Sequence, residues 1–179
     1  MIIKAKTEYT KELLIKYARF NSYKKTSQIV IYCFCELFML ALVGFLIYMA
    51  MSTGTAEVFT VTIICTATFP FIVPLILLLL PLFLAKMSKD AIGAVNIYEF
   101  SDIEVIIEST LPTAYGQTKA KYTFFESIYE TKNIFYLYIS KQQAFILKKS
   151  DITVSSVSDL QNLFKKNLPA NKYIIKIVK

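Results

Sequence analysis

Two apolar runs decide the architecture of this chain: IVIYCFCELFMLALVGFLIYMAM (residues 29–51) and VFTVTIICTATFPFIVPLILLLLPLFL (residues 58–84). The first run has 23 residues and one charged side chain, Glu36, and the second has 27 residues and none. A helix rises about 1.5 Å per residue, so each run is longer than the roughly 30 Å hydrocarbon core of a bilayer. Only residues 52–57 connect the runs. The pattern predicts a helical hairpin that crosses a membrane twice.

Two other interpretations fit the sequence less well. A helix buried in a soluble protein carries a polar stripe opposite its apolar face, whereas residues 69–84 are apolar all round. A cleaved signal peptide has a short apolar region near its start, whereas the first run here begins at residue 29 and a second run follows.

The charges that flank the runs predict the orientation of the hairpin. The connector carries no Lys or Arg, only Glu57. Basic residues beside a span stay on the cytoplasmic side. We therefore expect a multi-pass protein of the cell membrane with both termini in the cytoplasm. The flanking basic residues are Lys16, Arg19, Lys24, Lys25, Lys86 and Lys89.

Glu36 is the one carboxylate inside the predicted spans, about seven residues into the first. It is either a partner-binding or ion-sensing group or a tolerated side chain that is protonated or reaches the interface. The cysteines Cys33, Cys35 and Cys65 also lie in the spans, and the chain has no histidine to complete a metal site. We expect buried, inert thiols, no metal and no cofactor.

The segment before the hairpin, residues 1–25, predicts a strand and a basic helix. Residues 1–6 form the strand, Thr7 is the expected N-cap, and residues 8–21 repeat apolar side chains at helical spacing. The apolar side of this helix lies either in the membrane interface or against the soluble domain. The sequence leaves these two alternatives open.

After Gly93 the pattern changes to short alternating strands, which predict an antiparallel meander in residues 94–170. Residues 134–140 are apolar on both sides, as in a strand that is covered on both faces. A loop is expected at residues 112–116. The expected strands are residues 94–100, 103–109, 117–124, 127–131, 134–140 and 143–148.

A final amphipathic helix is predicted for residues 157–167, with Ser156 and Asp159 as its N-terminal capping pair and Pro169 as its stop. Residues 171–179 are either a terminal strand or a basic tail. Together the patterns predict a membrane hairpin at residues 26–90 and an α+β domain. In that domain a curved sheet or partial barrel of about six strands is plugged by the helix.

Four stretches carry a resemblance to a known family: NIYEFSDI (residues 96–103), YTFFESIYE (122–130), FYLYIS (135–140) and AFILKKSD (144–151). In this order, after a two-span hairpin, they resemble the YcxB-like family of bacterial membrane proteins. The resemblance implies a cytoplasmic domain similar to bacterial pleckstrin-homology (PH) folds, with residues 1–6 joining the sheet as a seventh strand.

The composition argues against catalysis. The chain has no histidine and its four glycines are scattered singly, so no phosphate loop is present. The net charge of +7 comes without a base-reading motif, so nucleic acid is not an expected partner. We expect a non-catalytic binding module that is anchored in the bilayer and binds a protein or a lipid headgroup.

For a lipid headgroup, the candidate contacts are Lys119, Lys121, Lys148 and Lys149, together with the basic residues that precede the hairpin. The alternative is that these lysines only keep the domain soluble. The second functional hypothesis is a bacteriocin or toxin immunity protein, or a membrane-stress protection protein, that acts through the hairpin. A homo-oligomer is left open.

Overall fold

The computed structural model describes residues 2–24, 26–53, 60, 64, 68, 72, 75, 79–83, 86, 89–111 and 114–176. The chain forms two compact units. One unit, the sheet domain, combines Met1–Tyr17 with Met87–Lys179, and the other consists of Ala18–Lys86. The sheet domain therefore includes residues from both ends of the chain.

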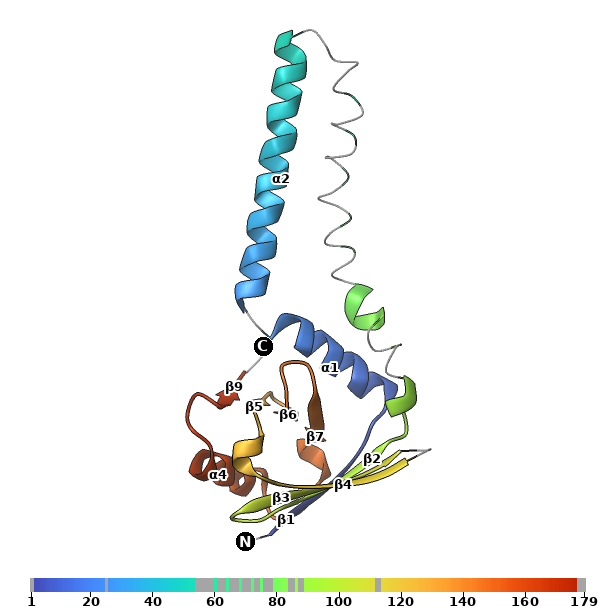
Figure 1. Ribbon diagram of the computed structural model, residues 1–179, viewed down its shortest axis with the longest axis vertical. Helices are drawn as coiled ribbons and strands as arrows, with labels where there is room; N and C mark the ends of the chain where they lie inside the picture. The colour runs from blue at the N-terminus through green and yellow to red at the C-terminus, as the bar shows by residue number, and fades with distance from the viewer. Residues whose placement is uncertain are drawn as a thin grey trace. The chain divides into compact units, whose positions relative to one another are not determined.

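The first sheet of the sheet domain has five strands in the order β4-β3-β2-β1-β8. Figure 1 labels β1, β2, β3 and β4 of this sheet. All its neighbours are antiparallel. β1 lies between β2 and β8, and its side chains alternate between buried and exposed. The N-terminal strand is thus an interior member of the sheet. The strands are β1 (Ile3–Glu8), β2 (Val95–Phe100), β3 (Glu104–Leu111), β4 (Ala114–Lys121) and β8 (Ile152–Val154).

The second sheet has four strands in the order β7-β6-β5-β9. β5, β6 and β7 form an antiparallel meander, and β9 adds to β5 in parallel. All five residues of β6 are buried, as predicted for a strand that is covered on both faces. The strands are β5 (Ser127–Glu130), β6 (Ile134–Tyr138), β7 (Ala144–Lys148) and β9 (Tyr173–Ile175).

Side-chain hydroxyl groups join the two sheets where β7 meets β1. The Tyr98 hydroxyl donates to the Ile146 carbonyl at 2.9 Å, and the Ile146 amide donates to the Tyr9 hydroxyl at 2.7 Å. The Thr7 hydroxyl accepts from the Lys148 amide at 3.4 Å. Because buried main-chain groups need partners, these hydroxyls take the place of a strand ladder. The sheets therefore stay separate instead of closing into one barrel.

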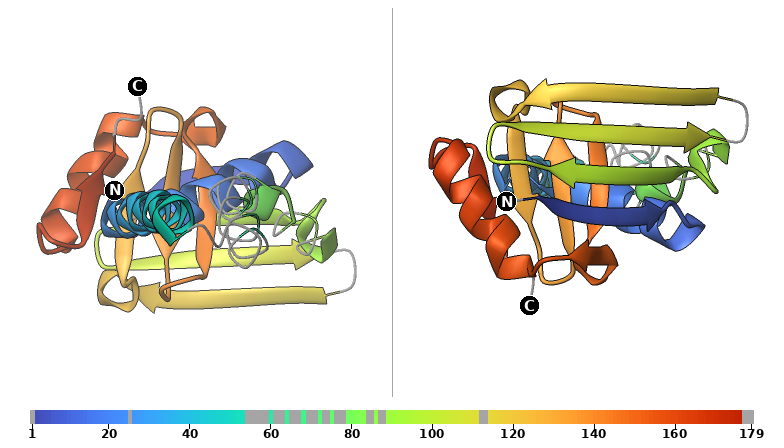
Figure 2. Two further views of the ribbon diagram at one scale, coloured as in Figure 1. Left: turned by 90° about the horizontal axis from the view of Figure 1, so that it is seen from above. Right: turned by 90° about the horizontal axis from the view of Figure 1, so that it is seen from below.

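Helix α4 (Val157–Asn167) has the predicted bounds and closes the core. The Ser156 hydroxyl accepts from the Asp159 amide at 3.2 Å, and the Asp159 carboxylate accepts from the Ser156 amide at 2.9 Å, which confirms the predicted capping pair. Leu160, Leu163 and Phe164 of this helix join the core cluster. Figure 2 shows α4 beside the ends of the strands of the five-stranded sheet.

The position of helix α1 (Lys11–Tyr23) decides where its apolar side packs and shows that the predicted N-cap was wrong. Its residues Leu13 and Leu14 are buried, and the Tyr17 ring lies 5.9 Å from the Tyr136 ring. The apolar side of the helix therefore packs on the sheet domain. Thr7 is not the N-cap, because it is a buried residue of β1. The cap is Thr10, whose hydroxyl accepts from the Leu13 amide at 3.3 Å.

Helix α2 (Thr26–Thr53) contains the first apolar run. Its segment Cys33–Thr53 is long and apolar enough to cross a membrane, judged by length and composition, and few of its side chains are buried. Cys33 and Cys35 lie on the surface of this helix, where a surrounding bilayer would cover them. In the second run the described residues are helical. The remainder of that run, Cys65 and the connector 54–57 lie outside the described residues.

The strand predictions differ from the structure mainly at β4 and β8, and several other strand ends are shifted by one or two residues. β4 begins at Ala114, inside the predicted loop, and ends at Lys121, where a short 3-10 helix, η2 (Tyr122–Phe124), replaces the predicted continuation. β8 was not predicted, and it follows another 3-10 turn, η3 (Lys149–Asp151). Strand β9 at Tyr173–Ile175 agrees with the strand alternative for residues 171–179, of which 177–179 lie outside the described residues. The described part of the chain has nine strands in two sheets, not six or seven in one.

Candidate functional site

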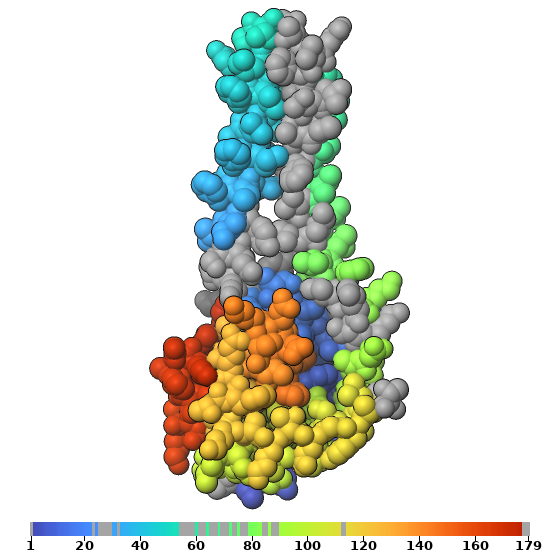
Figure 3. All heavy atoms as spheres, in the orientation of Figure 1, coloured from blue at the N-terminus to red at the C-terminus, as the bar shows by residue number. Residues whose placement is uncertain are grey.

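A cleft of about 390 Å³ opens on the sheet domain between the start of α1 and the strands β6 and β7. In Figure 3 the β6–β7 hairpin, in orange, borders α1, in blue. The lining combines two lysines, one carboxylate, three neutral polar side chains and two apolar ones. These residues are Thr10, Glu12, Leu13, Lys16, Asn133, Ile134, Lys148 and Ser150.

Local hydrogen bonds fix the two walls of the cleft. On one wall Thr10 caps α1, and its hydroxyl uses a lone pair for the Leu13 amide, so the hydroxyl hydrogen is left for another acceptor. On the other wall the Thr131 hydroxyl bonds both the amide and the carbonyl of Ile134 across the β5–β6 turn. The Asn133 carbonyl accepts from the Lys149 amide at 2.9 Å, which holds this turn beside the end of β7.

The two lysines of the cleft differ in whether they form an ion pair. Glu12 and Lys16 are one helical turn apart and form an ion pair of 2.7 Å. The hydrogen bond and the charge of Lys16 lower the pKa of Glu12, and the charge of Lys148 adds to this effect. Among the described residues of the sheet domain, none forms an ion pair with Lys148. The cleft therefore holds one paired lysine and one lysine that is available to an anion.

The predicted lysines do not form a single patch. Lys119 and Lys121 lie on β4, an edge strand of the five-stranded sheet, and Lys119 pairs with Glu104 at 2.7 Å. Lys148 lies on β7, which contacts β1 at the other side of the same sheet. Three strand spacings of about 4.8 Å separate β4 from β1. The lysines of β4 therefore belong to a different surface from the cleft.

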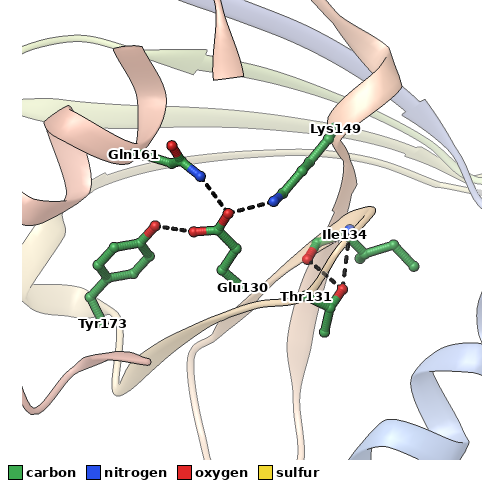
Figure 4. A network of polar contacts seen from close by, with 6 residues as sticks. All are labelled: Glu130, Thr131, Ile134, Lys149, Gln161 and Tyr173. Carbon is green, nitrogen blue, oxygen red and sulfur yellow. Dashed lines mark hydrogen bonds and ion pairs between the residues drawn. The ribbon is translucent and has the colours of Figure 1, made fainter. Parts of the chain in front are cut away.

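Lys149 faces the interior of the domain (Figure 4). Its ammonium group pairs with the carboxylate of Glu130, which is only 3% exposed. The Gln161 amide donates to the same carboxylate at 2.5 Å, and the Tyr173 hydroxyl donates to its second oxygen. This Glu130 network joins β5, η3, α4 and β9. Lys149 is therefore committed to a buried carboxylate.

The ionisation of the Glu130 network follows from these contacts. Burial alone would raise the pKa of Glu130, but the hydrogen bonds from Lys149, Tyr173 and Gln161 and the charge of Lys149 together lower it. Burial and the neighbouring Glu130 carboxylate raise the pKa of Tyr173, so its hydroxyl stays a donor. Glu130 was not predicted to be a site residue. The alternation along β5 was the available signal, because Glu130 lies two residues after the buried Ile128 and therefore on the same, inward face of the strand.

The remaining predicted residues lie in the unit Ala18–Lys86 or outside the described residues. Arg19 is exposed on α1, Lys24 is partly buried and has a polar or electrostatic partner, and Lys25 lies outside the described residues. Glu36 is partly exposed on α2. Within the described ranges no group of three or more Cys, Asp or Glu side chains is placed to hold a metal ion.

Comparison with known proteins bears on the central part of the sheet domain. Residues 100–164 match the model of the YcxB-like protein family. This match confirms the predicted resemblance over a stretch that runs from the end of β2 into α4. The YcxB-like stretch contains Glu130, Lys149 and Gln161 of the buried network, and Asn133 and Lys148 of the cleft. No curated protein and no solved structure matches the chain.

Proposed function

We propose that this protein is a non-catalytic binding module anchored in the bacterial cell membrane by a two-span hairpin. Its PH-like sheet domain would bind a ligand at the cytoplasmic face of the membrane. The observation that carries the proposal is the way the chain leaves the sheet domain and returns to it. The Tyr9 amide donates to the Ala94 carbonyl at 2.8 Å, and the Gly93 amide donates to the Tyr9 carbonyl at 2.9 Å.

This junction constrains the topology of everything between residues 9 and 93. Because β1 and β2 are paired neighbours in one sheet, both ends of the intervening segment lie on the same side of any membrane. If α2 crosses a membrane, the chain must cross back before β2. The apolar run at residues 58–84 is long enough for that return. The connectivity therefore supports an even number of crossings.

The character of α2 supports a lipid environment. Cys33–Thr53 would extend about 32 Å at about 1.5 Å per residue. A core helix of a soluble protein buries its large apolar side chains, whereas Phe34, Leu37 and Phe38 of α2 are mostly exposed. A cleaved signal sequence would remove β1 together with the helix, and β1 is an interior strand of the sheet. A membrane span is consistent with each of these observations.

The PH-like assignment and the cytoplasmic orientation rest on separate arguments. Two sheets around one core, with a C-terminal helix at their open end, resemble the arrangement in PH folds. Basic residues beside the spans favour the cytoplasmic side. The immunity hypothesis, in which the hairpin acts near Glu36 or the connector 54–57, stays a prediction.

The orientation predicts which positions react with an impermeant thiol reagent. In a variant with Cys33, Cys35 and Cys65 replaced by serine, we expect Ser52→Cys at the end of α2 to be labelled in intact cells. We expect Asn162→Cys, on the exposed side of α4, to be labelled only after the membrane is opened. Both variants should remain in the membrane pellet after a carbonate wash.

Three results would count against the proposal. Labelling of Asn162→Cys in intact cells would place the sheet domain outside. Labelling of Ser52→Cys only after permeabilisation would show that the hairpin has the opposite orientation in the membrane. Release of the protein by carbonate would exclude a spanning anchor.

A further inference from the structure

We propose that the cleft between α1 and β7 binds the phosphate group of a phosphorylated ligand through Lys148, with Lys16 and Thr10 as further donors. This inference deepens the proposed function and rests on it, because it names the ligand class of the binding module. The cleft lies wholly within the sheet domain, since its lining comes from residues 10–16 and 133–150.

The volume of the cleft fits a small organic ligand. Ligand pockets occupy about 300–1,000 Å³, and this cleft measures about 390 Å³, which exceeds the needs of an inorganic anion alone. Leu13 and Ile134 supply an apolar part of the lining. The lining therefore suits a phosphate group attached to a short organic portion such as glycerol.

The donors of the cleft suit phosphate. An ammonium group offers three donors and one full charge, and phosphate presents several acceptor oxygens. Lys148 meets this need because its charge has no ion-pair partner in the described part of the sheet domain. The Thr10 hydroxyl hydrogen is also available, because its bond to the Leu13 amide uses only a lone pair. Both groups line the cleft.

A substitution at Glu12 should change the affinity for an anion in the opposite direction to a substitution at Lys148. Its carboxylate lines the same cleft and holds Lys16 in an ion pair of 2.7 Å. The carboxylate therefore repels a bound anion and also occupies one of the two lysines. Neutralising Glu12 removes the repulsion and releases Lys16, so anion binding should become tighter.

The test uses the full-length protein in an uncharged detergent, with glycerol phosphate as the probe and sodium chloride at equal ionic strength as the reference. Isothermal titration calorimetry gives the dissociation constant. We expect Lys148→Gln to weaken binding about tenfold, as loss of one strong charge-assisted hydrogen bond would. Glu12→Gln should tighten binding severalfold. The matched control is Lys121→Gln on β4, which removes the same charge outside the cleft and should leave the constant unchanged.

A second arm distinguishes a lipid headgroup from a free phosphorylated compound. In nanodiscs of phosphatidylglycerol, bilayer headgroups should compete with the probe and weaken its apparent affinity in the unmodified protein if the natural source is lipid. An affinity equal to that in detergent assigns a free compound. Both outcomes support a phosphate site.

The proposal is overturned if millimolar glycerol phosphate does not bind, or if Lys121→Gln weakens binding as much as Lys148→Gln. Circular dichroism of each variant verifies that the domain is folded. Failure of the membrane anchor is seen separately in the carbonate wash. A protein that binds the probe but leaves the membrane would keep the phosphate site and refute the anchored module.

Discussion

Phe164→Ala should lower the free energy of unfolding of the sheet domain by about 3–5 kcal/mol, the range for truncating a fully buried aromatic side chain. Phe164 is 0% exposed and belongs to α4. Its ring lies 5.7 Å from Phe100 in the five-stranded sheet and 5.6 Å from Phe135 in the four-stranded sheet. One side chain thus fills the space between the two sheets, and its loss leaves a cavity that neither sheet is placed to fill.

The measurement is thermal unfolding of the full-length protein in detergent, followed by near-ultraviolet circular dichroism. The chain has 12 tyrosines and no tryptophan, and buried rings such as Tyr98, Tyr122 and Tyr138 report on the sheet domain. Phe124→Ala is the matched control, because Phe124 is 48% exposed on η2. A midpoint shift for Phe164→Ala no larger than that of the control would contradict the role of Phe164 as the central core residue.

Elements that carry their signal within a few residues were predictable from the sequence. The bounds of α4 follow from Ser156, Asp159 and the apolar spacing after them, because a capping pair and a helical face are local patterns. Residues 134–140 were predicted as a doubly covered strand because their apolar and aromatic side chains leave no polar face, and β6 forms over the first five of them. Its two covers are the core on one side and α1 on the other, where the Tyr17 ring lies 6.3 Å from the Tyr138 ring.

Elements that depend on distant partners were predicted incorrectly or missed. Thr7 suits both a strand and an N-cap, and only its burial against β7 decides for the strand. β8 has three residues, too few for an alternation, and its pairing with β1 crosses nearly the whole chain. A terminal strand was one of two alternatives for residues 171–179, and only the parallel pairing of β9 with β5 decides for it.

The candidate site was predicted only in part for the same reason. Lys16 and Lys148 were named from the sequence as candidate lipid contacts, together with Lys119, Lys121 and Lys149, but without any indication of which of them lie close together. Their separation follows from strand order and from the inward turn of Lys149. The neutral lining residues of the cleft, such as Thr10 and Asn133, carry no chemical signal of their own in the sequence.

The second large effect is expected at Glu130. Glu130→Gln should destabilise the sheet domain by about 3–5 kcal/mol, the range for breaking a buried ion pair by removing one partner. The change leaves the Lys149 ammonium without its counter-charge, and the side chain of Lys149 is only 17% exposed. Glu104→Gln is the matched control, because it breaks an ion pair with Lys119 of 2.7 Å that is exposed and should cost at most about 1 kcal/mol.

A double variant separates the ion pair from simple loss of packing. Lys149→Met combined with Glu130→Gln removes both charges, so no buried charge is left without a partner. We expect the double variant to unfold at a higher temperature than Glu130→Gln alone. If the two single changes instead add, Glu130 and Lys149 are not coupled and the interpretation of the network fails.

The same network predicts how the stability of the domain depends on pH. The pKa of Glu130 in the folded domain lies below its ordinary value of 4.5, so the unfolded chain takes up a proton first as the pH falls. The stabilisation is therefore complete above about pH 4.5 and is lost progressively as the pH falls from there through the folded pKa. Glu130→Gln removes this titration, so the difference in melting temperature between the unmodified protein and the variant should shrink below pH 4.5. A difference that stays constant down to acid unfolding would show that the carboxylate contributes through its shape and not through its charge.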